Sequence, residues 1–127
     1  MNLERTKKLI HEGIDRDNPM ESLIHVLESA LELVSIPENE FCWSSWEDEN
    51  EAQQEILGLI NSIKNGVLPD RLKISVIFAP TGPLQELSMS SGWAKTYLIV
   101  AERFDEVEAL LWQKGYLRED NATKESI

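Results

Sequence analysis

The sequence predicts a mostly helical α+β fold, in which about four helices pack on a small antiparallel β-hairpin or short sheet. Two observations predict it. Apolar residues recur at helical spacing over several long stretches, and a run of β-forming residues at 72–79 is bordered by turn sequences. The length of 127 residues suits one domain. We expect this domain to span residues 1–117 and residues 118–127 to be a frayed polar tail.

The first two helices are predicted over residues 2–14 and 18–34. Residues 2–14 place apolar side chains among charges, which is typical of an amphipathic helix. In the second helix Asn18 is the expected cap, Pro19 suits the first turn, and Glu21 completes a capping-box arrangement. The expected buried stripe is Met20, Leu23, Ile24, Leu27, Ala30, Leu31 and Val34. The acidic residues expected on the opposite side are Glu28 and Glu32.

The aromatic segment at 38–47 is predicted as either a short edge strand or a structured loop. The next helix is expected from about Asp48 to Asn65, because Ser45 or Asp48 can cap it and acidic residues crowd its first turn. Its expected buried stripe is Ala52, Ile56, Leu59, Ile60 and Ile63.

The alternation in residues 72–79 predicts a strand, with Leu72, Ile74, Val76 and Phe78 on one face. Pro80 to Pro83 reads as a turn in which Gly82 takes positive φ, and residues 84–89 are expected to return as the second strand. Ser90 or Ser91 is the expected cap of a last helix that runs to about Gln113, with Gly115 ending it. Its expected apolar face is Trp93, Tyr97, Val100, Ala101, Phe104, Val107, Leu110 and Leu111.

The charge balance restricts the class of partner. With 23 acidic and 12 basic residues the net charge is −11, which repels nucleic acid and anionic membranes and attracts a basic protein. The single cysteine, Cys42, favours a reducing compartment, and the first 14 residues lack the apolar core of a signal peptide. We expect a cytoplasmic protein.

No catalytic, metal or cofactor motif is found. His11 and His25 lie on different predicted helices without metal-site spacing, and His25 is expected at a packing or solvent edge. Cys42 has acidic neighbours that raise a thiol pKa, so we expect a small, partly buried residue rather than a nucleophile. The serines before Gly92 lack a nucleophile elbow, and Pro83 removes a donor that a phosphate loop would use.

The aromatic and acidic residues between the second and third helices are the candidate partner-binding site. Tryptophan is enriched at interface hot spots, and surrounding charge steers a partner's approach. The alternative is that both tryptophans are core anchors. The candidate residues are Trp43, Trp46, Glu47, Asp48, Glu49 and Glu51.

Two segments, Phe41 to Trp46 and Phe78 to Trp93, give the sequence a resemblance to a class of small acidic bacterial proteins of uncharacterised function. The resemblance covers residues 38–107, and some members of the class are immunity-like partners of secreted toxins. It implies a binding protein and no catalytic residues.

We therefore expect a non-enzymatic protein-binding module, an immunity-type inhibitor of a basic partner being one form of it. One alternative is a structural or regulatory homodimer that completes its hairpin across a symmetric interface. Another is a small-ligand binder or enzyme with a pocket between hairpin and helices, for which the candidates are Gln85, Glu86 and Tyr97.

Overall fold

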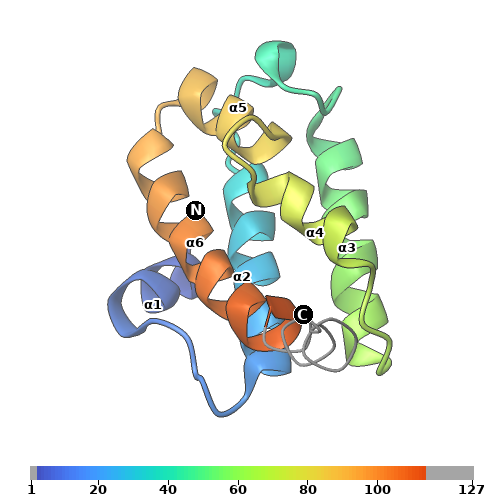
Figure 1. The fold of residues 1–127 in the computed structure, drawn as a ribbon. Coiled ribbons are helices and arrows are strands. Elements are labelled where there is room, and N and C mark those ends of the chain that lie inside the picture. The colour runs from blue at the N-terminus through green and yellow to red at the C-terminus, as the bar shows by residue number, and fades with distance from the viewer. Residues whose placement is uncertain (1–2, 114–127) are drawn as a thin grey trace, which may run out of the picture.

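Helices form all the regular secondary structure of residues 3–113, which are the residues that the computed structural model describes (Figure 1). No strand occurs in this range, so the predicted α+β class is wrong for it. In chain order the elements are α1 (Glu4–Glu12), α2 (Pro19–Val34), the 3₁₀ turn η1 (Phe41–Trp43), α3 (Glu49–Lys64), α4 (Arg71–Phe78), α5 (Pro83–Ser91), α6 (Ala94–Glu108) and the π-type turn η2 (Ala109–Gln113).

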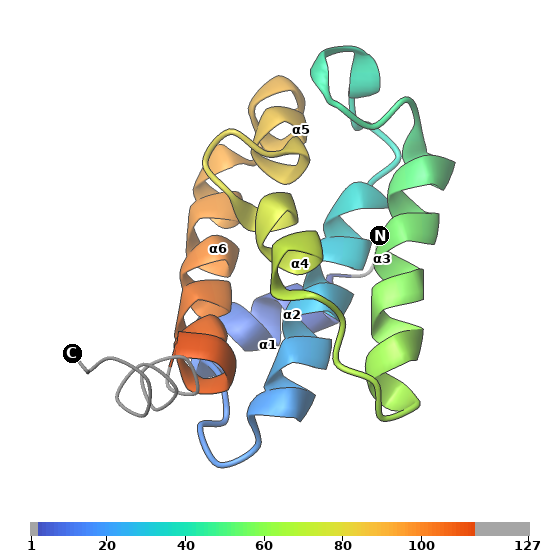
Figure 2. The same ribbon diagram turned by 45° about the vertical axis from the view of Figure 1, so that its right-hand side comes forward.

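Helix α2 is the centre of the packing. It contacts α1, α3, α5, α6 and η2, and Figures 1 and 2 show it between α3 and α6. A helix surrounded by other elements must be apolar over most of its circumference. Six of its apolar side chains are at most 1% exposed, and these are Leu23, Val26, Leu27, Ala30, Leu33 and Val34. The predicted stripe is thus confirmed in part, and the buried surface is wider than predicted.

The start of α2 lies at Pro19, as predicted, but the capping box is wrong. The Asn18 side chain makes no capping hydrogen bond and instead donates to the Asp15 carboxylate at 2.9 Å. Ser22 accepts from the Asp15 amide and donates to the Asp15 carbonyl, both at 2.9 Å. The turn before α2 is therefore held by Asp15 and Ser22.

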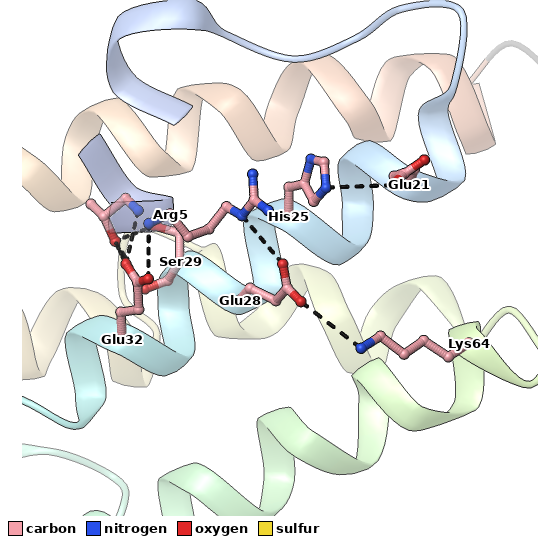
Figure 3. Close-up of polar contacts among 8 residues, drawn as sticks. Arg5, Glu21, His25, Glu28, Ser29, Glu32 and Lys64 are labelled. Carbon is pink, nitrogen blue, oxygen red and sulfur yellow. Dashed lines mark hydrogen bonds and ion pairs between the residues drawn. The ribbon is translucent and has the colours of Figure 1, made fainter. Parts of the chain in front are cut away.

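Helix α1 is capped at both ends by side chains from other helices. At its N-terminus the Glu32 carboxylate accepts from the amides of Arg5 (2.9 Å) and Thr6 (2.8 Å) and from the Thr6 hydroxyl (2.8 Å) (Figure 3). At its C-terminus Arg103 donates to the carbonyls of Leu9 and Ile10, both at 3.0 Å. A carboxylate at the first turn and a guanidinium at the last both suit the helix dipole.

Glu28 and Glu32, which are predicted on the side of α2 opposite its buried stripe, thus both hold neighbouring helices. Besides Glu32, the Glu28 carboxylate lies 3.3 Å from Arg5 Nε on α1 and 4.0 Å from Lys64 Nζ on α3 (Figure 3). These contacts join three helices across a partly exposed polar surface.

The segment predicted as a hairpin forms α4 and α5. The Asp70 carboxylate caps α4 by accepting from the Leu72 amide at 3.0 Å, and Pro83 occupies the first turn of α5. Burial in α4 follows helical spacing, since Ile74, Ile77 and Phe78 are buried. Leu72 and Val76, predicted to share the buried face of a strand, are 71% and 52% exposed. Tertiary packing of the helical stripe therefore overrides the β-propensity of this run.

Helices α3 and α6 agree better with prediction. Asp48 caps α3 by accepting from the Glu51 amide at 2.9 Å, and all five residues of its predicted stripe are buried. Helix α6 buries Tyr97, Val100, Phe104 and Val107 as expected. Its predicted cap is wrong, because Ser90 and Ser91 lie at the end of α5, where Gly92 has a left-handed conformation (φ 89°).

The prediction that Gly82 takes positive φ is wrong, because its φ is −87°. Glycine is required here because the backbone of α4 lies too close to leave room for a side chain. It is buried where the chain leaves α4, and its amide donates to the Ala79 carbonyl at 2.8 Å. A β-carbon at this position would overlap the Val76 carbonyl oxygen and lie 3.3 Å from that of Ile77. The α4–α5 connection therefore needs glycine for space.

The expectations for Gly115 and for the tail at 118–127 concern positions outside the described range. Among the helices that are described, none combines the length and the apolar character needed to cross a membrane.

Removing the Glu32 carboxylate should destabilise the protein. We expect Glu32→Ala to lower the free energy of unfolding by about 2 kcal/mol, because it leaves the first amides of α1 without an acceptor. Urea denaturation measures this change. Glu38→Ala removes an exposed carboxylate in the connection after α2 and should change stability by less than about 0.5 kcal/mol. Equal losses from both variants would contradict the capping role.

Glycine-to-alanine substitutions at two sites should have opposite effects. Gly82→Ala should cost about 1–3 kcal/mol because the added methyl group meets α4 carbonyls. Gly58→Ala lies in α3 with no atom within 4 Å of the added carbon, so it should stabilise by up to about 1 kcal/mol. Thermal denaturation distinguishes the two, and a stabilising Gly82→Ala would show that the connection has room.

Candidate functional site

Residues 39–48, here called the Trp43 loop, lie between α2 and α3 and contain four of the six predicted binding residues. The other two, Glu49 and Glu51, lie in the first turn of α3. The loop contains the 3₁₀ turn η1 and no strand, so of the two alternatives the structured loop is confirmed. In both ribbon views it lies at the same end of the molecule as α5, which it contacts (Figures 1 and 2).

Two sets of hydrogen bonds hold the loop on α5. The Glu40 amide donates to the Ser91 hydroxyl at 2.9 Å, and the Ser90 hydroxyl donates to the Glu40 carbonyl at 2.8 Å. Beyond η1, the amide and hydroxyl of Ser45 both donate to Glu86 Oε1 at 2.8 Å. The loop is thus held on both sides of Trp43 by side chains about 40 to 50 residues further along the chain.

The two candidate tryptophans have different roles. Trp46 is 3% exposed, and its indole N–H donates to the Glu55 carboxylate of α3 at 2.9 Å. Trp43, three residues earlier, is 78% exposed. Trp46 is therefore the core anchor of the loop, and Trp43 alone is available to a partner.

The acidic candidates lie at the end of the loop and in the first turn of α3. Glu47, Asp48, Glu49 and Glu51 are all exposed, but two of them also hold the backbone. Asp48 is the cap of α3, and Glu51 Oε1 accepts from the Glu47 amide at 2.6 Å. A capping role is compatible with partner attraction, because an exposed carboxylate keeps its charge while it accepts a hydrogen bond.

Cys42, adjacent to Trp43, is exposed, so the expected partly buried position is wrong. The expected direction of its pKa is supported. The hydrogen bond to the Glu40 side chain and the charge of that carboxylate both raise the pKa of the Cys42 thiol. Glu40 also accepts from the Cys42 amide at 3.0 Å, so the thiol and the loop backbone share one neighbouring carboxylate.

The remaining sequence candidates are dispersed. Gln85 and Tyr97 line a groove between α4 and α6, whereas Glu86 is bound to the Trp43 loop instead. His25 is partly buried, with Nε2 3.7 Å from the Glu21 carboxylate (Figure 3), and its pKa is lowered by burial and by the charge of Arg5. Within the described range no group of three His, Cys, Asp or Glu side chains could hold a metal ion.

Sequence reasoning missed the residues that position Trp43. The sequence predicts Ser90 or Ser91 as a helix cap and Glu86 as a pocket residue. Their contacts with residues 40–45 depend instead on the packing of α5. No local pattern indicates such pairs.

The pKa of Cys42 tests the geometry of the loop. Glu40→Gln removes the charge and keeps an amide oxygen that can accept from the Cys42 amide. We expect this variant to lower the thiol pKa and to speed alkylation by iodoacetamide at mildly alkaline pH, because the thiolate is the reactive form. Glu38→Gln is the matched control and should leave the rate unchanged. The same rate in wild-type and Glu40→Gln proteins would show that Glu40 does not act on the thiol.

Comparisons of this chain with models of known protein families, with curated proteins and with solved structures found no match. The resemblance to small acidic immunity-like proteins therefore stays a prediction from the sequence.

Proposed function

We propose that the protein is a non-enzymatic, cytoplasmic binding protein that holds a basic partner protein through the Trp43 loop, an immunity-type inhibitor being one form of this function. The observation that carries the proposal is the 78% exposure of Trp43 in a loop fixed on both sides by hydrogen bonds.

The energetics of Trp43 favour a binding role. Exposing a large aromatic side chain forgoes the stabilisation that its burial would give. A partner that covered Trp43 would gain this stabilisation, and tryptophan is enriched among the few residues that dominate interface energies. Because α5 already holds the loop, little conformational entropy would be lost on binding.

Electrostatics favour a basic partner. The net charge of −11 attracts a positively charged surface over long range, and exposed Glu47 lies in the loop with exposed Glu49 directly after it. An arginine or lysine of the partner could also stack on the indole ring of Trp43. The same charge disfavours nucleic acid and anionic membranes as partners. The exposed thiol of Cys42 suits a reducing compartment.

The structural argument for the homodimer alternative no longer applies. It depended on a two-stranded hairpin that needs a third strand, and residues 71–91 instead form α4 and α5. Two copies that each carry −11 also repel one another.

Partner capture tests the proposal. Immobilised protein is exposed to host lysate at low and at moderate salt, and retained proteins are identified by mass spectrometry. We expect one basic protein in stoichiometric amount, retained less as salt screens the attraction. Trp43→Ser should then weaken the affinity for that protein, measured by titration calorimetry, by about tenfold or more.

The control is Val67→Ser, which removes another exposed apolar side chain (60% exposed) beyond the far end of α3. It should leave the affinity unchanged. Retention that does not respond to salt would refute the electrostatic part of the proposal. Equal affinities of wild-type and Trp43→Ser proteins would refute the role of the Trp43 loop.

A further inference from the structure

An open groove of about 960 Å³ lies between α4 and α6. Its floor includes the stacked rings of Phe78 and Phe104, whose centroids are 4.6 Å apart with an angle of 11° between the planes. Beside them the Tyr97 hydroxyl donates to the carbonyls of Phe78 (2.8 Å) and Ala79 (3.0 Å). These contacts join α4 to α6 and fix the position of the two groove walls relative to each other.

The upper walls of the groove are apolar and exposed. Leu72 and Val76 lie one helical turn apart on α4 and are 71% and 52% exposed, and Leu98 of α6 is 62% exposed. Isolated exposed leucines are common, but three large apolar side chains around one groove indicate a binding surface.

The α6 wall is also acidic. It carries Glu102, Asp105 and Glu108. Among the described residues only Glu108 of these three has a cationic partner, because its carboxylate lies 2.9 Å from Arg71 Nε. Burial, followed by the charges of Glu108 and Glu102, raises the pKa of Asp105. Lys73 on the α4 wall forms no ion pair with the described residues. A cation placed beside Glu102 and Asp105 would relieve the repulsion between them.

We propose that the α4–α6 groove binds an amphipathic helix of another protein, with its apolar side against Leu72, Val76 and Leu98 and a lysine or arginine beside Glu102 and Asp105. The charge of the α6 wall selects a basic occupant. The geometry selects a helix, because apolar anchors one turn apart fit a groove between two helices. An extended peptide would find no strand edge to pair with in the described part of the chain.

This site is separate from the Trp43 loop, because the residues that line the groove include none at 39–48. The inference therefore goes beyond the proposed function, and either could fail without the other.

The test uses a fluorescein-labelled peptide of about 14 residues, composed of leucine and lysine with leucine at helical spacing. Its binding to the full chain is measured by anisotropy at moderate salt, where non-specific attraction is screened. We expect saturable binding of this peptide, and at least about tenfold weaker binding of a shuffled peptide without the helical period and of one with glutamate for lysine. No saturable binding, or equal binding of the shuffled peptide, would overturn the proposal.

Variants locate the site. Leu72→Ser with Leu98→Ser, and separately Glu102→Gln with Asp105→Asn, should each weaken binding by about tenfold. Two controls match them. Met89→Ser removes an apolar side chain, 67% exposed, outside the groove, and Asp17→Asn with Glu38→Gln removes two exposed charges elsewhere. Equal weakening by the controls would show attraction to the whole surface and refute the groove.

The stability of Asp105→Asn shows whether lost binding is due to unfolding. Because the pKa of Asp105 is raised in the folded state, its ionised form destabilises the protein at neutral pH, and this cost disappears as pH falls below the ordinary value of 3.8. We expect Asp105→Asn to raise the melting temperature at neutral pH, with a gain that shrinks on acidification. Weaker peptide binding by this more stable variant supports the proposal, whereas weaker binding together with a lower melting temperature contradicts it. Trp43→Ser should bind the peptide as the wild type does, which separates this site from the Trp43 loop.

Discussion

The burial of α2 is the constraint on which the rest of the structure depends. Its apolar side chains are covered by α1, α3, α5 and α6, and each fully buried leucine or valine contributes about 1.5–3 kcal/mol. The polar side of α2 also contributes, because Glu32 caps α1 and Glu28 faces Arg5 and Lys64. A single central helix therefore positions α1 and α3 through polar contacts as well as apolar packing, and α6 through apolar packing.

Sequence patterns predicted the helices whose signals are local. Pro19 marks the start of α2 and Asp48 caps α3, and both helices have long apolar stripes, so their bounds agree closely with prediction. The same reasoning failed at 72–79, where apolar residues alternate and β-branched side chains are frequent. Only the packing of Ile74, Ile77 and Phe78 in the core decides that this run is helical. Pro83 was assigned to a turn, although proline is equally suited to the first turn of a helix.

The candidate site could be predicted in part. The sequence shows where the site lies, between α2 and α3, and that its surroundings are acidic. It does not show that Trp43 is exposed and Trp46 buried, because both are large aromatic residues in one short segment. Their separation depends on α5, whose residues Ser90, Ser91 and Glu86 hold the loop. The groove could not be predicted from the sequence either, because Leu72 and Val76 are exposed only when residues 71–78 are helical. Both proposed surfaces thus depend on residues 71–78 and 83–91 being helical, the groove on α4 and the Trp43 loop on α5.

That helical state is tested most directly by the backbone ¹³C chemical shifts of residues 71–91 in the full chain. The structure predicts downfield Cα and upfield Cβ shifts over Arg71–Phe78 and Pro83–Ser91, with an interruption at residues 79–82. Shifts of the opposite sign over residues 72–79 and 84–89 would show the hairpin instead. The groove and the support of Trp43 by α5 would then both lose their structural basis.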